Sequence, residues 1–346
     1  MRTSGAPIVQ SATVTRPPAV DIHAHFYPES FFKVIEEEGA AFGMRLDRSN
    51  PKGPVLAGAD APGPPLDATY WDVDRRVRAM DRAGVAVHAL SLTAPMTHWA
   101  RGETARRVAR AVNDAMAEAH RAYPDRFVGC ATLPMQEPAL AQAELERAAT
   151  LPGIRAVYMG TNVNGRELSD PDFQPLFARC QALGLPVLLH PLTVIGHQRL
   201  QPFYLHNFLG NPFDTAIAAA HLVFGGVLDR FPKLQVLLPH AGGALPVLYG
   251  RLTHGQGVRP ETRGVARKPF KAYLRRFTYD TISHSPEILR YLIATVGADR
   301  VMLGSDYCFD MGYARPRDII TKHARLSKAD QARVLGGNAL RLLGLR

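Results

Sequence analysis

Cysteine is scarce in this chain, and long apolar runs are absent. The three cysteines, at positions 130, 180 and 308, lie too far apart for a disulfide framework or a zinc knuckle, which fits a reducing compartment. No apolar run approaches the roughly eighteen residues that a membrane-spanning helix needs, so we expect no membrane partner. Residues 1–18 also lack the continuous apolar segment of a secretory signal, which predicts a disordered leader and a cytoplasmic protein.

A dense basic tail is also absent, although the formal net charge is +10. The basic residues are mostly arginines scattered among acids, as in Asp74-Arg75-Arg76. This distribution is typical of a solvated arginine-rich surface, and it predicts no nucleic-acid partner. The same excess of positive charge is also compatible with an active-site cleft that attracts small carboxylates.

Short apolar strands alternate with helices along almost the whole chain, whose 46% hydrophobic content is typical of a globular protein with ample core. The predicted strands cover residues 20–25, 85–90, 127–131, 154–158, 186–189, 234–238, 276–281 and 300–303. The main predicted helices cover residues 28–38, 72–83, 103–123, 137–149, 172–183, 212–230, 286–296 and 328–343. Such alternation implies parallel strands joined by helical crossovers.

Eight strand–helix units predict an α/β fold, a (β/α)8 barrel of the TIM type, formed as a single domain over residues 19–346. The main rival is a doubly wound open sheet, which would carry a Gly-x-Gly-x-x-Gly motif after its first strand. The chain lacks that motif there and has His23-x-His25 instead. Residues 39–69 contain many Gly and Pro with little periodicity, so we predict an insertion after the first strand that crosses the barrel mouth.

Residues able to bind a metal ion stand at or just after four of the predicted strands. His23 and His25 end the first strand and, two residues apart, point to the same face. His190, His240 and Asp306 follow the fifth, sixth and eighth strands. Any one of them could be a helix cap or a core histidine. Together they favour a metal site, because the carboxyl ends of barrel strands meet at one rim.

Imidazole nitrogen and carboxylate oxygen suit one divalent ion, most simply Zn²⁺, with Mn²⁺ or iron as alternatives. We predict His23, His25, His190 and Asp306 as the ligands, a set that leaves a position for water or substrate. Asp306 therefore belongs to the catalytic residues as well. We predict His240 as the general acid/base, because an imidazole can take up and return a proton near neutral pH.

These motifs resemble the signature of the amidohydrolase superfamily, and within it the amidohydrolase family 2 branch typified by aminocarboxymuconate-semialdehyde decarboxylase. The motifs are His23-x-His25, His190-Pro191, His240-Ala241-Gly242-Gly243 and Gly304-Ser305-Asp306-Tyr307. The resemblance extends over nearly the whole chain from residue 20. Binuclear members of the superfamily often carry a carbamylated lysine at the fourth strand. That strand ends in Tyr158-Met159-Gly160 here, so the resemblance implies a single metal ion.

The resemblance implies a metal-dependent carboxy-lyase that removes CO2 without oxidation from a carboxylated muconate semialdehyde or an aromatic, phenolic acid. The resemblance leaves two mechanisms open. In one, His240 deprotonates metal-bound water and hydroxide adds next to the departing carboxylate; in the other, the substrate binds the metal directly and its carbon is protonated as CO2 leaves. A hydrolase or hydratase on the same metal, acting on a lactone, an amide or an unsaturated acid, is the alternative class. A binding protein without activity is a third reading, which a missing ligand would favour.

The resemblance also implies a small carboxylate as substrate and suggests which residues bind it. Arg251 and Arg259 match positions where the decarboxylase holds its substrate carboxylate. The second arginine comes from the neighbouring subunit in that family, which implies a homodimer with Arg259 reaching the neighbouring site. Both could instead be ordinary surface arginines. Trp99 follows the second strand and either lines the pocket or packs its mouth.

Three departures from the family pattern put the identity of the substrate in doubt. Pro64 stands where the decarboxylase has a further substrate arginine, and Asn162 stands where its fourth strand ends in Gly-Thr-His. Cys308 replaces a proline after Asp306-Tyr307. We keep Asn162 as a candidate substrate-binding residue. None of these changes removes a predicted metal ligand.

Overall fold

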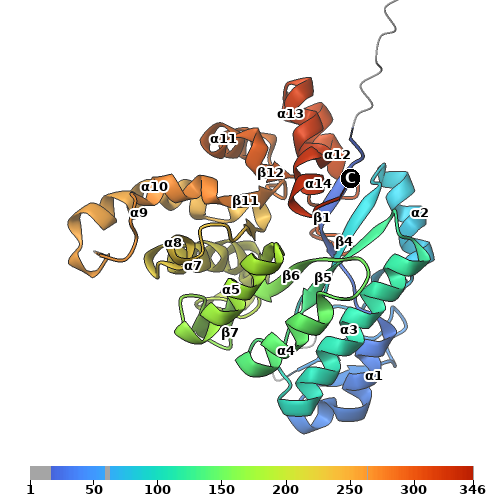
Figure 1. The fold of residues 1–346 in the computed structure, drawn as a ribbon. Coiled ribbons are helices and arrows are strands. Elements are labelled where there is room, and N and C mark those ends of the chain that lie inside the picture. The colour runs from blue at the N-terminus through green and yellow to red at the C-terminus, as the bar shows by residue number, and fades with distance from the viewer. Residues whose placement is uncertain (1–16, 59–62, 263, 346) are drawn as a thin grey trace, which may run out of the picture.

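Eight parallel strands form the centre of the computed structural model, which describes residues 17–58, 63–262 and 264–345. They are β1 (Val20–His25), β4 (Val87–Ser91), β5 (Phe127–Thr132), β6 (Ile154–Gly160), β9 (Val187–His190), β10 (Val236–Leu238), β11 (Phe277–Asp280) and β12 (Val301–Met302). Each strand pairs with the next in that order (Figure 1). All of these pairs are parallel.

The sheet closes on itself between β12 and β1. The backbone N–H of Ile22 donates to Leu303 O at 2.9 Å, and the N–H of Asp306 donates to His23 O at 3.0 Å. A parallel bridge between Ala24 and Tyr307 continues this seam. The predicted (β/α)8 barrel is therefore confirmed.

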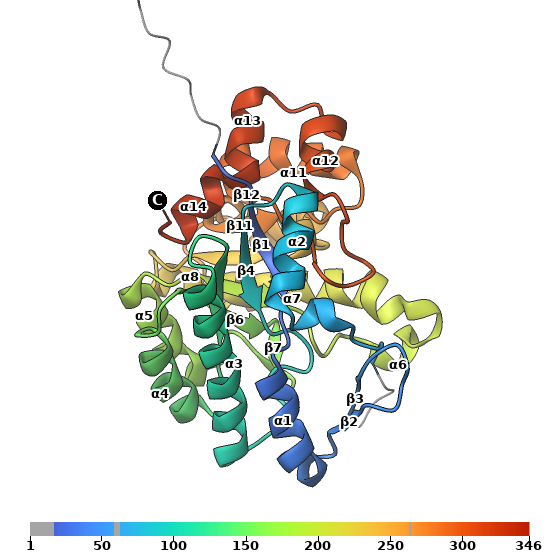
Figure 2. The same cartoon turned by 90° about the vertical axis from the view of Figure 1, so that its right-hand side faces the viewer.

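Helices cover the outside of the barrel in the predicted alternation (Figures 1 and 2). The longer ones are α1 (Glu29–Glu38), α2 (Val73–Ala83), α3 (Gly102–Ala122), α4 (Pro138–Ala148), α5 (Gln174–Leu183), α7 (Asn211–Phe224), α9 (Leu245–Val258) and α11 (Pro286–Val296). The shorter ones are α6 (His197–Leu200), α8 (Val227–Arg230), α10 (Phe270–Tyr273), α12 (Pro316–Asp318), α13 (Lys328–Ala332) and α14 (Asn338–Leu342).

Local sequence explains both ends of α2. The Asp72 side chain accepts a hydrogen bond from the N–H of Arg75 and so caps α2, and Gly84 ends that helix with a φ of 67°. The single helix predicted over 212–230 is wrong in one respect, because it is divided into α7 and α8. Gly226 has a φ of 73°, which a helix interior does not allow.

The segment between β1 and α2 forms the insertion that the sequence predicts. It contains the antiparallel hairpin of β2 (Arg45–Asp47) and β3 (Val55–Ala57). Figure 2 shows this hairpin on the same side of the barrel as α6. Side chains of the insertion, including Met44 and Leu56, line the same cavity as the metal-ligand candidate His190. The insertion therefore forms part of the wall above the strand ends.

Apolar side chains fill two layers, one inside the barrel and one between the strands and the helices. Ile22, Ala89 and Val128 belong to the inner layer, whereas Phe127 and Val157 belong to the outer layer. Two smaller strands, β7 (Asn162–Val163) and β8 (Arg166–Glu167), form a separate hairpin.

No helix of the described ranges is long and apolar enough to cross a membrane. The predicted disordered leader over 1–18 lies mostly outside the described residues, and the domain division that goes with it stays a prediction.

Candidate metal centre and active site

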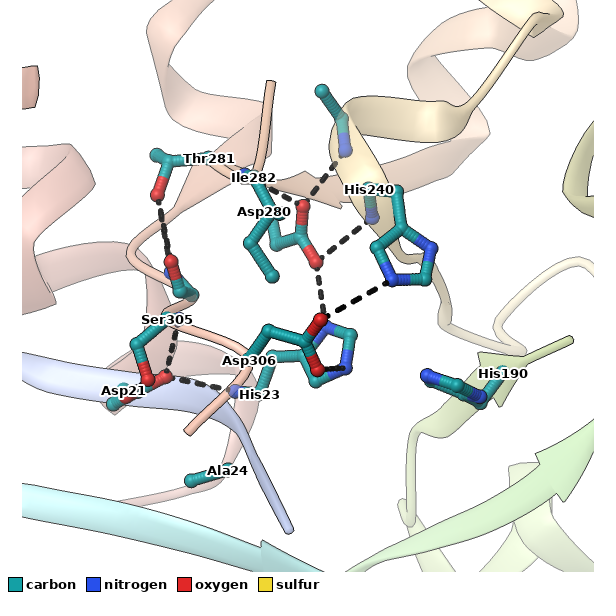
Figure 3. A network of polar contacts seen from close by, with 12 residues as sticks. Asp21, His23, Ala24, His190, His240, Asp280, Thr281, Ile282, Ser305 and Asp306 are labelled. Carbon is teal, nitrogen blue, oxygen red and sulfur yellow. Dashed lines mark hydrogen bonds and ion pairs between the residues drawn. The ribbon is translucent and has the colours of Figure 1, made fainter. Parts of the chain in front are cut away.

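Four of the predicted residues meet at the carboxyl ends of the barrel strands. His23 and His25 are the fourth and last residues of β1, and His190 is the last residue of β9. Asp306 follows β12 in a segment that continues alongside β1. One potential ligand atom from each of the four residues lies within 4.8 Å of the others, and all four residues are buried. Figure 3 shows His190 approaching from the side opposite to Asp306.

The distances within this group are short. His23 Nε2 lies 3.1 Å from His25 Nε2, and His25 Nε2 lies 2.9 Å from Asp306 Oδ1. The ring of His190 is centred 5.3 Å from that of His23 and 5.0 Å from that of His25. Burial lowers the pKa of His25 to about 4, so its ring is neutral at neutral pH. Neutral imidazoles are the form that binds a metal ion.

Outer contacts fix which nitrogen of the ring faces the centre. His23 Nδ1 lies 2.8 Å from Asp280 Oδ2, so it carries the proton and donates to the carboxylate. His190 Nδ1 lies 2.8 Å from the carbonyl oxygen of Pro191, which requires the same tautomer. The Nε2 lone pairs of both rings are therefore free to bind. Three imidazole nitrogens and a carboxylate oxygen fit one divalent ion of the zinc or manganese kind.

Asp280 holds this arrangement together, and it was not among the residues predicted from the sequence. Its Oδ2 accepts the proton of His23 Nδ1 and the backbone N–H of His240, the latter at 3.0 Å. Its Oδ1 accepts the backbone N–H groups of Ala241 and Ile282 at 2.7 and 3.0 Å (Figure 3). Burial would raise the pKa of Asp280, but the hydrogen bond and charge of His23 bring it below its ordinary value. The sequence feature that could have indicated Asp280 is its position as a carboxylate at the end of the seventh barrel strand.

His240 stands beside the ligand group without belonging to its closest contacts. Its Nε2 lies 3.9 Å from Asp306 Oδ2, and its Nδ1 is buried without a hydrogen-bond partner among the described residues. Burial lowers the pKa of His240 below its ordinary value. Its backbone has a φ of 53°, and the two bonds from His240 and Ala241 to Asp280 hold this conformation.

The glycines after His240 are needed for packing. A Cβ on Gly242 would lie 2.7 Å from the ring of Tyr279, and one on Gly243 would lie 2.2 Å from the carbonyl oxygen of Pro212. Close approach of the backbone to β11 and α7 therefore explains both glycines of the His-Ala-Gly-Gly motif.

Two further buried side chains, those of Asp21 and Arg76, form hydrogen bonds with the backbone of β1. Asp21 accepts the backbone N–H groups of His23 and Ser305, each at 3.0 Å, and so ties the first strand to the loop that carries Asp306. Arg76 is fully buried and donates to the carbonyl oxygen of His25 at 2.5 Å. Both contacts act on the backbone of the candidate ligands His23 and His25 rather than on their ring nitrogens.

A cavity of about 600 Å³ opens above the ligand group. His190, His240 and Asp306 form part of its lining, and the walls come from the insertion and from the loops after β4, β9 and β12. A cavity of this size accommodates a small organic substrate.

The predicted substrate residues lie in different places. Trp99 lines the cavity, and its Nε1 donates to Met96 O at 3.1 Å. Asn162 is buried outside the lining, and its Nδ2 donates to Thr193 O at 2.8 Å and to Asp214 Oδ2 at 3.1 Å.

Arg251 and Arg259 are exposed on α9 and at its end, and neither lines the cavity of its own chain. Helix α9 extends away from the barrel in Figure 1. Arg259 pairs with Glu261 there.

Residues 20–345 match the family described as amidohydrolase. This chain belongs to the amidohydrolase family. Within it, the chain is 33% identical over 330 residues to 2-amino-3-carboxymuconate-6-semialdehyde decarboxylase of Dictyostelium discoideum, covering 94% of this chain and 91% of that protein. The resemblance that the motifs indicate is therefore confirmed for the family.

Solved structures of two decarboxylases have the same fold. The 5-carboxyvanillate decarboxylase of Sphingomonas paucimobilis superposes with a TM-score of 0.82 at 27% identity, covering 95% of this chain and 99% of that one. A dihydroxybenzoic acid decarboxylase of Polaromonas sp. JS666 with bound manganese gives a TM-score of 0.77 at 26% identity, covering 95% and 97%. A divalent metal site in this chain agrees with the second structure.

Proposed function

We propose that this chain is a metal-dependent, non-oxidative decarboxylase of a small aromatic acid or a carboxylated muconate semialdehyde. The observation that carries the proposal is the convergence of His23, His25, His190 and Asp306 at the floor of a cavity that also contains His240. The similar proteins named above are decarboxylases of acids of these two kinds, which supports a carboxy-lyase over other reactions of the family.

His23, His25, His190 and Asp306 would hold one divalent ion, for which we propose zinc, with manganese as the alternative. When bound, the ion would polarise an oxygen of the substrate and stabilise negative charge that develops during the reaction. The donor set suits either metal. The manganese in the Polaromonas structure supports the alternative.

His240 would handle the proton that decarboxylation requires. When the bond from carbon to the carboxylate breaks, its electron pair stays on the carbon, which must then take up a proton. His240 Nε2 would accept a proton from a substrate hydroxyl or from water and return it to that carbon. Its low pKa and its position beside Asp306 support this role.

We propose that arginine pairs with the substrate carboxylate, since a guanidinium binds a carboxylate in a bidentate manner. Arg251 and Arg259 stay the candidates. They do not line their own cavity, so a homodimer in which the partner subunit's Arg259 enters the site is part of the proposal. Trp99 would pack against the substrate, and Asn162 would shape the cavity wall through Thr193. Three free cysteines support a reducing, cytoplasmic location.

The test is CO2 release by protein that has been stripped of metal and reloaded with zinc or manganese. The substrates are a panel of carboxylated phenols and muconates, and the His240→Ala variant is assayed beside the parent. We expect CO2 from at least one acid, no turnover without metal, and a loss of about 10²-fold or more in His240→Ala. Hydrated or ring-opened products without CO2 would favour the hydrolase or hydratase alternative.

A further inference from the structure

The cavity above the metal group, which is formed by the candidate ligands His23, His25, His190 and Asp306, has no cationic wall. Among its described lining residues there is no lysine and no arginine. The carboxylates that line it are Asp306, at the metal group, and Asp310, near the mouth. Every fixed charge that these residues present to a substrate is therefore negative.

The histidines away from the metal group do not supply positive charge either. Burial lowers the pKa of His98 to about 4, and burial together with the nearby His197 lowers the pKa of His206. Both rings are neutral at neutral pH. They can exchange hydrogen bonds with a neutral group of the substrate, as can the amides of Asn164 and Asn207.

The wall contributed by the insertion is apolar. Phe42, Met44, Leu56 and Leu66 line it, and Phe42 meets Trp99 edge to face with ring centroids 6.0 Å apart. Such a wall favours a flat apolar body and disfavours a charged one, because a charge buried without a partner loses its hydration without compensation.

We infer that this cavity selects a monocarboxylic acid whose remaining body is uncharged and ring-sized. The inference rests on the proposed decarboxylase function and narrows its substrate. One carboxylate is accounted for at the metal group, whereas a second one would face Asp310 and the apolar wall without a cation. A carboxylated muconate semialdehyde carries two carboxylates and is therefore disfavoured. The partner subunit's Arg259, if it enters the site, adds one guanidinium, and this guanidinium pairs with the reacting carboxylate that is lost as CO2.

The test compares three acids that share the same reacting end. Each is a 2-hydroxybenzoate that carries hydrogen, carboxamide or carboxylate at the ring position opposite the reacting carboxyl group. Carboxamide has nearly the size of carboxylate but no charge, so it controls for volume. With the metal-loaded enzyme we expect kcat/KM for the carboxylate to be about 100-fold below that for the carboxamide, mostly through KM. Equal or faster turnover of the carboxylate, or of a carboxymuconate semialdehyde, would overturn the inference.

A new cation in the wall should reverse part of this preference. Pro64 lines the cavity, and hydrogen bonds from Gly63 N to Leu56 O and from Leu66 N to Pro54 O fix the chain on both sides of it. Pro64→Arg should raise the ratio of carboxylate to carboxamide turnover about tenfold. Pro65 is next to it but outside the lining, so Pro65→Arg is the matched control, with a change below about twofold expected. Equal effects of both variants would count against a local charge preference.

Binding separates the inference from the proposed function. Calorimetry on the metal-loaded protein uses two nitrophenols, in which a nitro group replaces the reacting carboxylate and the far position carries carboxamide or carboxylate. Tighter binding of the carboxamide without any CO2 release would reject the decarboxylase and keep the cavity preference. CO2 release together with tighter binding of the carboxylate would keep the decarboxylase and reject the cavity preference.

Discussion

At the scale of single residues, Arg76 is the most unusual group near the site. Its side chain is fully buried, makes no ion pair with a described residue, and leaves Nε and Nη1 without hydrogen-bond partners. Its Nη2 donates to the carbonyl oxygens of His25 and Thr69, and the guanidinium lies 4.8 Å from the ring centre of Tyr307. A permanent charge is thus held against the backbone of a candidate metal ligand, where it fixes the end of β1.

Arg76→Met should weaken metal binding about tenfold, because residues that orient the ligands of a metal ion typically contribute this much. The measurement is competition with a chelator of known affinity. Arg126→Met is the control, since Arg126 also donates to a backbone carbonyl, Ala86 O at 2.8 Å, but at the opposite end of the barrel. An equal loss of metal affinity in both variants would mean that Arg76 acts only through general stability.

Asp280 offers a second prediction of this kind. Asp280→Asn keeps the shape of the side chain but removes the charge that fixes the proton on His23 Nδ1. We expect metal affinity to fall by about 10–100-fold. Asp229→Asn is the control, because Asp229 also accepts a backbone N–H, that of Arg267, away from the site. Unchanged metal affinity in Asp280→Asn would refute the orienting role.

The meeting of the four candidate ligands could be predicted from the sequence, whereas the contacts of Asp280 could not. His23 and His25 are two residues apart on one strand, so their common direction follows from the strand period alone. The role of Asp280 depends on its contact with His23, 257 positions away, and with the turn at His240. No local pattern carries that information. The sequence also left open which residues line the cavity wall, because the insertion has almost no periodicity.

At the scale of elements, the strands and helices could be predicted from apolar periodicity, whereas the ends of these elements have both local and long-range causes. Helix α7 ends before Gly226 for a local reason, a positive φ. The turn after β10 is different: Gly243 has a φ of 58° and approaches Pro212 at the start of α7. The sequence shows a glycine at position 243 but does not show that Pro212 is the neighbour that requires it.

Gly243→Ala should lower the free energy of unfolding by about 2 kcal/mol or more, since its Cβ would meet the backbone of Pro212 in a strained conformation. Gly250→Ala is the matched control. Gly250 lies inside α9 with open space around the position of a Cβ, so this variant should gain about 0.5–1 kcal/mol. Urea unfolding of the metal-free protein measures both. A neutral Gly243→Ala would show that the turn can relax without cost.

At the scale of the whole molecule, the metal group lies on the seam where the barrel closes. His25 belongs to the first strand of the barrel and Asp306 follows the last one, 281 positions later in the chain. Strand β12 is only two residues long, so the seam depends on a few backbone bonds near these side chains. An ion held by residues from both sides of the seam would cross-link the two ends of the fold, and metal binding would add directly to stability.

Metal should therefore stabilise the folded protein measurably. An ion at 100 times its dissociation constant adds about 2.7 kcal/mol to the free energy of unfolding, which corresponds to a rise in Tm of roughly 4 °C for a chain of this size. Thermal unfolding of stripped protein, with and without added manganese, measures the shift. His190→Ala should lose most of it, because it removes the ligand from β9, whereas the exposed His323→Ala should keep it. A full shift in His190→Ala would contradict the role of His190 as a ligand, because it would mean that the two imidazoles and one carboxylate at the seam hold the ion without it.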